Sequence, residues 1–233
     1  MTIMGIKKRE VSFSGHCGFT LIEVLITMLI SGIIMASIYS VFQSQQKSYV
    51  VQDQVAEMQQ NIRAATNVMV SEIRMAGYDP DGLGAAGITV ANTNSITFTL
   101  VADDDLLDNN GDTVTDEPGE LKTIQYDLYD AYGDGDNDIG RQVGAFASTK
   151  RAIAENIENI EFIYLDATGL PTAVLNNICT IQISILARSA RPDQDFVNSK
   201  NYTTASGTPW GPYNDNYRRR LRVTQVRCRN MGL

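Results

Sequence analysis

Apolar residues dominate the chain from Phe19 to Phe42, and the pattern becomes amphipathic after that point. The twenty-four residues of this run would extend about 36 Å as a helix, which exceeds the roughly 30 Å hydrocarbon core of a bilayer. The polar breaks Thr27, Ser31 and Ser37 are small hydroxyl residues, which can return a hydrogen bond to the helix's own carbonyls. The pattern therefore predicts a membrane-spanning helix over residues 19–42.

The amphipathic pattern predicts that the same helix continues over residues 43–77. No proline falls between Phe19 and Gly77, whereas Gly77-Tyr78-Asp79-Pro80 is typical of a helix end. The apolar stripe is too short for a coiled coil, so we expect it to pack on a sheet. Its members recur at steps of three and four and are Val51, Val55, Met58, Ile62, Ala65, Met69, Ile73 and Ala76.

The rest of the chain alternates apolar and polar residues with the period of strands. Turn-rich loops separate these segments, and no second long helix is indicated. The predicted fold is α+β, with a long N-terminal helix packed on an antiparallel sheet and a β-rich head over residues 78–233. The predicted strands lie near residues 96–100, 124–128, 160–164, 179–187 and 221–228.

One carboxylate, Glu23, interrupts the start of the apolar run. An ionised side chain inside a bilayer costs a few kcal/mol or more, so Glu23 needs a partner, and an amine is the obvious one. The residues before it are Gly18-Phe19-Thr20-Leu21-Ile22, and the basic triplet Lys7-Lys8-Arg9 stands upstream. This order resembles the processing signal of type IV pilins and of the pseudopilins of type II secretion. An ordinary signal peptide fits less well, because no small-residue cleavage site follows the apolar run.

The resemblance implies a type IV pilin-like fold and a specific maturation. A prepilin peptidase would remove residues 1–18 by cutting after Gly18 and would methylate the new amino group of Phe19. Glu23 would then pair with the Phe19 amine of a neighbouring subunit. Because the leader is basic, its end should stay in the cytoplasm of a single-pass inner-membrane protein, with the head in the periplasm and later in the extracellular filament.

A second resemblance concerns the C-terminal half of the chain. Residues 155–188, the Trp210-Gly211-Pro212 triplet and the arginine-rich end are similar to PilW-like minor pilins, and residues 161–166 also resemble the J-class minor pseudopilin of type II secretion. Both imply a structural subunit that primes filament assembly. Its partners would be other pilins, reached through the N-terminal helix, and an inner-membrane platform with a separate ATPase, since no phosphate-binding loop is present.

Acidic residues crowd the segment from Asp103 to Asp138, where thirteen Asp or Glu face a single base, Lys122. Carboxylates at alternate positions of a bent loop can converge on calcium, although neither run matches an EF-hand, and a solvated acidic loop is the alternative. A calcium-dependent adhesive tip is thus a further hypothesis. The candidate ligands are Asp108, Asn110, Asp112 and Asp116 in the first run and Asp134, Asp136 and Asp138 in the second.

Two cysteines, Cys179 and Cys228, would remain after leader removal. In a protein that matures outside the cytoplasm they are a candidate disulfide, and two buried thiols are the alternative.

Arginines crowd the last sixteen residues without any acid among them. They could contact an acidic neighbouring subunit or the chain's own acidic loops. A DNA-binding role is less favoured, because the chain's net charge is −8 and aromatic residues are few nearby. The arginines are Arg218, Arg219, Arg220, Arg222, Arg227 and Arg229.

Catalysis is not expected from this composition. The only histidine, His16, lies in the leader, so the mature chain cannot form a Ser-His or Cys-His pair. The sequence therefore favours a structural protein over an enzyme and names no catalytic residue. No certain cofactor is indicated, with calcium the only candidate.

Overall fold

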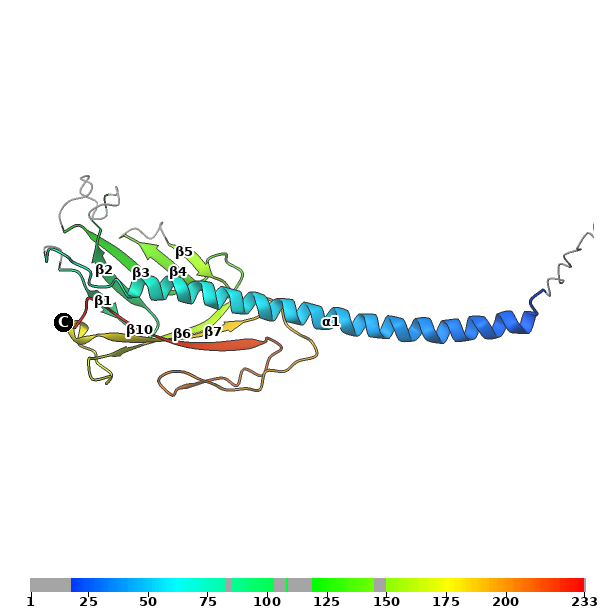
Figure 1. Cartoon of the computed structure of the whole chain (residues 1–233). Coiled ribbons are helices and arrows are strands. Elements are labelled where there is room, and N and C mark those ends of the chain that lie inside the picture. Colours follow the sequence, from blue (N-terminus) through cyan, green and yellow to red (C-terminus); the bar gives the residue numbers. More distant parts are fainter. Residues whose placement is uncertain (1–17, 83–84, 103–107, 109–118, 145–149, 233) are drawn as a thin grey trace, which may run out of the picture. The chain divides into compact units, whose positions relative to one another are not determined.

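The computed structural model describes residues 18–82, 85–102, 108, 119–144 and 150–232. The chain divides into two compact units, Met1–Tyr49 and Val50–Leu233. One helix, α1 (Leu21–Ile73), runs through both (Figure 1). Thr20 caps its start, where the Thr20 carbonyl accepts the N–H groups of Glu23 at 3.1 Å and Val24 at 3.2 Å. The predicted single helix is therefore confirmed, with bounds slightly inside those expected.

The helix ends in a tightened turn over residues 74–77. Met75 and Ala76 donate to carbonyls three residues earlier, at 2.9 and 3.1 Å, and Gly77 adopts a φ of 76°. A side chain is strained in that left-handed region, and a Cβ here would also lie 2.6 Å from the Met231 sulfur. Glycine is needed at this position for both reasons.

The first sheet has five antiparallel strands in the order β1-β2-β3-β4-β5, so each strand pairs with its neighbour in the chain. This order needs only short connections, because consecutive antiparallel strands can be joined directly. The bounds are β1 Ile88–Ala91, β2 Ile96–Val101, β3 Leu121–Tyr129, β4 Asp138–Val143 and β5 Arg151–Ala154.

A second antiparallel sheet has the order β10-β7-β6 and places the last long strand beside the central one. Its register pairs Val226 with Ile181, and Phe162 with Ile183. A short 3-10 helix, η2, and a two-stranded sheet, β8 with β9, lie between these strands in the sequence. The bounds are β6 Ile157–Leu165, η2 Leu175–Asn177, β7 Thr180–Arg188, β8 Tyr202–Thr203, β9 Pro209–Trp210 and β10 Arg219–Arg227.

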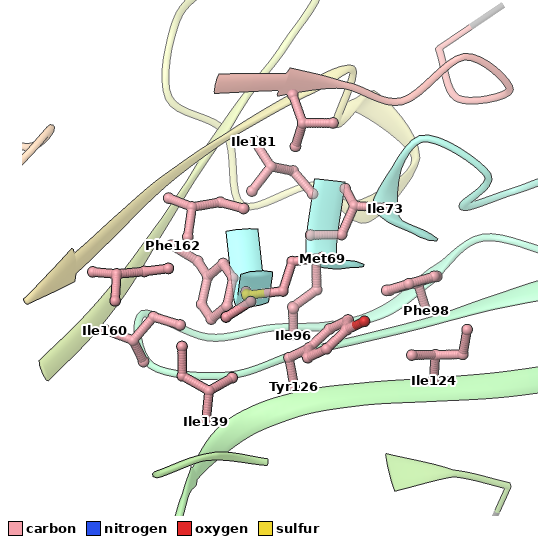
Figure 2. Close-up of a cluster of buried hydrophobic side chains, with 14 of the residues drawn as sticks. Met69, Ile73, Ile96, Phe98, Ile124, Tyr126, Ile139, Ile160, Phe162 and Ile181 are labelled. Atoms are coloured by element: carbon pink, nitrogen blue, oxygen red, sulfur yellow. The ribbon is translucent and has the colours of Figure 1, made fainter. Parts of the chain in front are cut away.

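The hydrophobic core of the unit 50–233 forms where the last part of α1 meets both large sheets (Figure 1). Figure 2 shows Met69 between Phe162 of β6 and Tyr126 of β3, and all three side chains are almost completely buried. The buried apolar positions of α1 repeat the predicted stripe from Met58 to Ile73, and Ala76 in the following turn is buried as well, with Val51 and Val55 half-buried. The stripe is therefore confirmed.

All five predicted strand segments are confirmed, as β2, β3, β6, β7 and β10. The predicted α+β fold, a long helix packed on antiparallel strands, is confirmed, and the strands divide between two larger sheets and a short hairpin. Alternation shows that a strand has two unlike faces but does not identify its neighbour. Five strands, β1, β4, β5, β8 and β9, were not predicted. Strand β4 begins at Asp138, the last residue of the expected acidic loop, and the other four have two to four residues each.

Candidate functional site

The segment that follows Gly18 presents an apolar surface over its whole length. Phe19 is 82% exposed and Leu21 79%, and the large apolar residues from there to Phe42 are also exposed. Of the helices that the structure describes, α1 alone is long and apolar enough to cross a membrane, and none of its apolar window is buried. This surface needs a lipid or protein environment, because water disfavours so large an apolar area.

The small polar residues of this run behave as predicted where the structure shows their bonds. Thr27 donates its hydroxyl to the Val24 carbonyl at 2.9 Å, and Ser37 donates to the Ile33 carbonyl at 2.9 Å. Both hydroxyls are therefore satisfied within the helix and do not require water.

Glu23 lies in the first turn of α1, where the helix dipole favours a negative charge. Its backbone N–H donates to the Thr20 hydroxyl at 3.4 Å, which is one half of a capping box. Within residues 18–49 as described, the Glu23 carboxylate makes no hydrogen bond or ion pair. The described residues of this segment thus bring a carboxylate to the start of the apolar run without a counter-charge beside it.

The second acidic run is held by bonds within its own loop. Asp130 accepts the N–H groups of Gly133 at 2.6 Å and Gly135 at 3.2 Å, and buried Asp138 accepts that of Ala131 at 3.0 Å. Burial and the adjacent Asp134 carboxyl raise the pKa of Asp136 to about 6, although Arg188 lies 3.4 Å away and opposes the shift. Burial also raises the pKa of Asp138.

In the described part of the chain, no group of three or more Asp, Glu, His or Cys side chains is arranged to hold a metal ion. The predicted convergence of Asp134, Asp136 and Asp138 is therefore not found in this structure. The reason is that Asp136 faces Arg188 while Asp138 bonds to the loop backbone. In the first run only Asp108 is described; Asn110, Asp112 and Asp116 lie outside the described residues.

Some of the C-terminal arginines find partners within the chain. Arg218 contacts Asp193 at 2.7 Å, and Arg219 contacts Glu158 at 2.8 Å and Asp215 at 2.6 Å. These acids lie outside the segment from 103 to 138, so these two arginines do not follow the alternative in which the acidic loops are their partners. No partner is found in the described residues for Arg220, Arg222 and Arg227.

The two cysteines lie at neighbouring ends of β7 and β10. Both are buried with free thiols, and the Cys228 N–H donates to the Cys179 carbonyl at 2.9 Å. Burial, reinforced by Cys179, raises the pKa of the Cys228 thiol to about 12. The disulfide remains a prediction, with its two residues placed side by side.

Two protein families match separate parts of the sequence. Residues 14–39 match the prokaryotic N-terminal methylation motif, and residues 154–230 match the type IV pilus-assembly protein W family. The chain thus carries a prepilin-type methylation motif and a PilW-type pilus-assembly region. The second match covers β6, β7 and β10, and the first includes Gly18, Phe19 and Glu23. These two matches support a structural minor pilin subunit that is anchored by its apolar helix and associated with the pilus.

Other comparisons add little to the two family matches. A type IV-like pilin from Thermus thermophilus superposes with a TM-score of 0.48 at 13% identity, covering 75% of this chain and 98% of its own. No curated protein matches the sequence at a significant level.

Sequence reasoning missed several charged residues that matter to the head. Glu72 and Arg141 pair across α1 and β4, and Arg63 lies on α1 next to β10. The sequence around Arg63 and Arg141 gives no sign of a partner for either side chain. Only the approach of distant elements distinguishes them.

Proposed function

We propose that this minor pilin enters the filament through a charge pair between Glu23 and the N-methylated amino group of Phe19 in an adjacent subunit. The pair would form after a prepilin peptidase cuts between Gly18 and Phe19. An unpaired carboxylate among apolar side chains costs a few kcal/mol, and a terminal ammonium removes that cost. Correctly registered subunits are thereby favoured over misplaced ones.

The observation that carries this proposal is the state of Glu23. Within residues 18–49 its carboxylate has no partner, while the apolar side chains around it are exposed. A helix of this kind is stable in lipid or against other apolar helices. Once the leader is removed, the counter-charge would come from a neighbouring subunit or from the chain's own processed terminus.

The same proposal gives the chain a topology and partners. The leader would remain in the cytoplasm, residues 19–42 would cross the inner membrane, residues 43–77 would continue the helix, and residues 78–233 would form a periplasmic head. After assembly the subunit would lie in the extracellular pilus and help to prime its formation. An inner-membrane platform with a separate ATPase would supply the energy.

The subunit would act as a structural protein and not as an enzyme. A leader histidine is the only one in the sequence, so the processed chain would have no imidazole base for nucleophilic catalysis. Calcium binding by the first acidic run and a disulfide between Cys179 and Cys228 stay predictions beside this function.

The test uses Glu23→Ala and Glu23→Gln in the native host, with Glu57→Ala as the matched control. Glu57 is an exposed glutamate further along the same helix. Both Glu23 variants should be inserted and processed but recovered poorly in sheared pili, whereas Glu57→Ala should assemble normally. Normal incorporation of Glu23→Gln would refute the charge pair.

Processing is tested separately by mass spectrometry of the native protein. We expect a mature chain that begins at N-methylated Phe19, and an uncut precursor when Gly18 is replaced by a larger residue. A start at any other residue would overturn the assignment. Loss of protein secretion without loss of pili in a deletion strain would favour the pseudopilin alternative.

A further inference from the structure

A groove lies between α1 and the edge strand β10 in the unit 50–233. It consists of two hollows of about 330 and 130 Å³, and Arg220 lines both. The larger hollow has apolar walls from Val55, Met58 and Phe196, and the smaller is lined by Arg63 and Arg222. We call this feature the arginine groove and define its basic part as Arg63, Arg220 and Arg222.

The alternation of β10 explains why its arginines face the helix. Arg220 and Arg222 share a strand face with Val226, which is buried in the core. Their partners across the sheet, Ala187 and Ile185, are core residues as well. Where the core ends, this face therefore brings two guanidinium groups toward α1, and Arg63 contributes a third.

The three basic side chains gather without a counter-charge. No acid lines either hollow among the described residues, and no ion pair to Arg63, Arg220 or Arg222 is found in that part of the chain. Arg218 and Arg219 beside them do have acid partners. Like charges held together repel one another, so an anion bound here would be favoured.

Protection of the sheet edge does not account for this arrangement. Charged side chains on an edge strand discourage pairing with other chains, and Arg227 can serve that purpose on the opposite face of β10. Edge protection gives no reason for arginines of β10 to converge with an arginine of α1. The groove instead has the composition of a binding site for carboxylates, which guanidinium groups bind in a bidentate manner.

Residues 103–118 of the same sequence have the complementary composition. They contain seven Asp or Glu and no Lys or Arg, and Leu106 and Leu107 stand between acidic residues. Carboxylates suit Arg63, Arg220 and Arg222, while leucine side chains suit the apolar walls at Val55 and Met58.

We propose that the arginine groove binds the acidic segment 103–118 of a second copy of this chain. The contact would join two heads side by side without any further partner. It does not depend on cleavage at Gly18 or on the pairing of Glu23.

The experiment uses the full chain in detergent micelles and a fluorescent peptide with the sequence of residues 103–118. Arg220→Gln/Arg222→Gln should weaken peptide binding about tenfold or more, since the loss of charge-assisted bonds worth about 1.4 kcal/mol gives that factor. The matched control Arg227→Gln/Arg229→Gln removes two exposed arginines of the same chain end and should change affinity less than about twofold by the same scale.

Other outcomes would overturn the proposal. Equal weakening by both arginine pairs would indicate a diffuse basic surface. A peptide with Leu106→Ser and Leu107→Ser should bind more weakly. If its affinity is unchanged, the leucines do not contact the apolar walls of the groove. A further variant replaces the acids of the chain's own segment 103–118 with Asn and Gln. If the peptide binds only to this variant, the groove of the unaltered chain is already occupied by its own segment, and the contact lies within one chain.

Binding of a short DNA duplex with the same arginine dependence, together with no peptide binding, would assign the groove to nucleic acid. Failure of peptide binding would leave the Glu23 experiment unaffected, so the two proposals can fail separately.

Discussion

Glu72 of α1 and Arg141 of β4 form a bidentate ion pair, with Arg141 Nη2 2.6 Å from Glu72 Oε1 and Arg141 Nε 2.9 Å from Glu72 Oε2. The hydroxyl of buried Tyr126 donates to the same carboxylate. Tyr126 also stacks on Phe98 in the core (Figure 2). The helix and the five-stranded sheet are thus joined by a polar contact at the border of the apolar core, where water screens charges only partly.

Arg141→Gln should destabilise the head by about 2 kcal/mol, because it leaves the Glu72 carboxylate without its cation. The value lies below that of a fully buried pair, since the Arg141 and Glu72 side chains are 28% and 23% exposed. Urea unfolding of a fragment of residues 50–233, which contains all the core residues, measures the change. Arg151 lies opposite Arg141 in the pairing of β4 with β5 and is exposed, so the control Arg151→Gln should have little effect. Equal effects of both substitutions would mean that the ion pair contributes nothing.

Gly77→Ala should destabilise the head more than Gly169→Ala. Both glycines have positive φ, 76° and 83°, so each substitution should cost about 1 kcal/mol in backbone strain. Only at Gly77 would the new Cβ also clash, 2.6 Å from the Met231 sulfur. Thermal melting compares the two variants, and Met231→Ala should partly rescue Gly77→Ala but not Gly169→Ala. Equal melting temperatures would show that the turn can move away from Met231.

Stability should rise as the pH falls from about 7 toward 5, because of Asp136. Its folded-state pKa, raised to about 6 by burial and by Asp134, lies above the ordinary value near 4. The folded state therefore binds the proton more tightly, so protonation on passing below pH 6 favours folding. Melting of the fragment across this range tests the sign. Asp136→Asn should flatten the profile, and a wild-type melting temperature that falls steadily from pH 7 to 5 would contradict the expectation.

The Cys228 thiol should react slowly with alkylating reagents even when it is reduced. Burial raises the pKa of Cys228 to about 12, so very little thiolate exists at pH 8.

In protein purified from an oxidising compartment, we expect peptide mapping to find Cys179 and Cys228 linked. The closed loop of about 50 residues would contribute about 4 kcal/mol in the chain-entropy model. Rapid labelling of both thiols in the untreated native protein would refute the disulfide and the protection together.

Prediction from sequence succeeded where a pattern repeats along one element. The stripe from Met58 to Ala76 revealed the buried face of α1, and alternation revealed β2, β3, β6, β7 and β10. Short strands such as β5 lack enough residues for a period to appear, and β4 was hidden because its first residue, Asp138, continues an acidic run. The calcium site expected at Asp134, Asp136 and Asp138 stays a prediction, because spacing does not determine where each carboxylate points.

The sequence alone determined the long helix, its apolar first half with Glu23, and the methylation motif that contains Gly18 and Phe19. These features are local, since a helix places neighbours in sequence next to each other and a peptidase recognises consecutive residues. Only the tertiary structure decided the division into two sheets, the pairing of Glu72 with Arg141, and the convergence of Arg63 with Arg220 and Arg222. Those relationships join residues far apart in the chain, and their distances depend on how helix and sheets pack together.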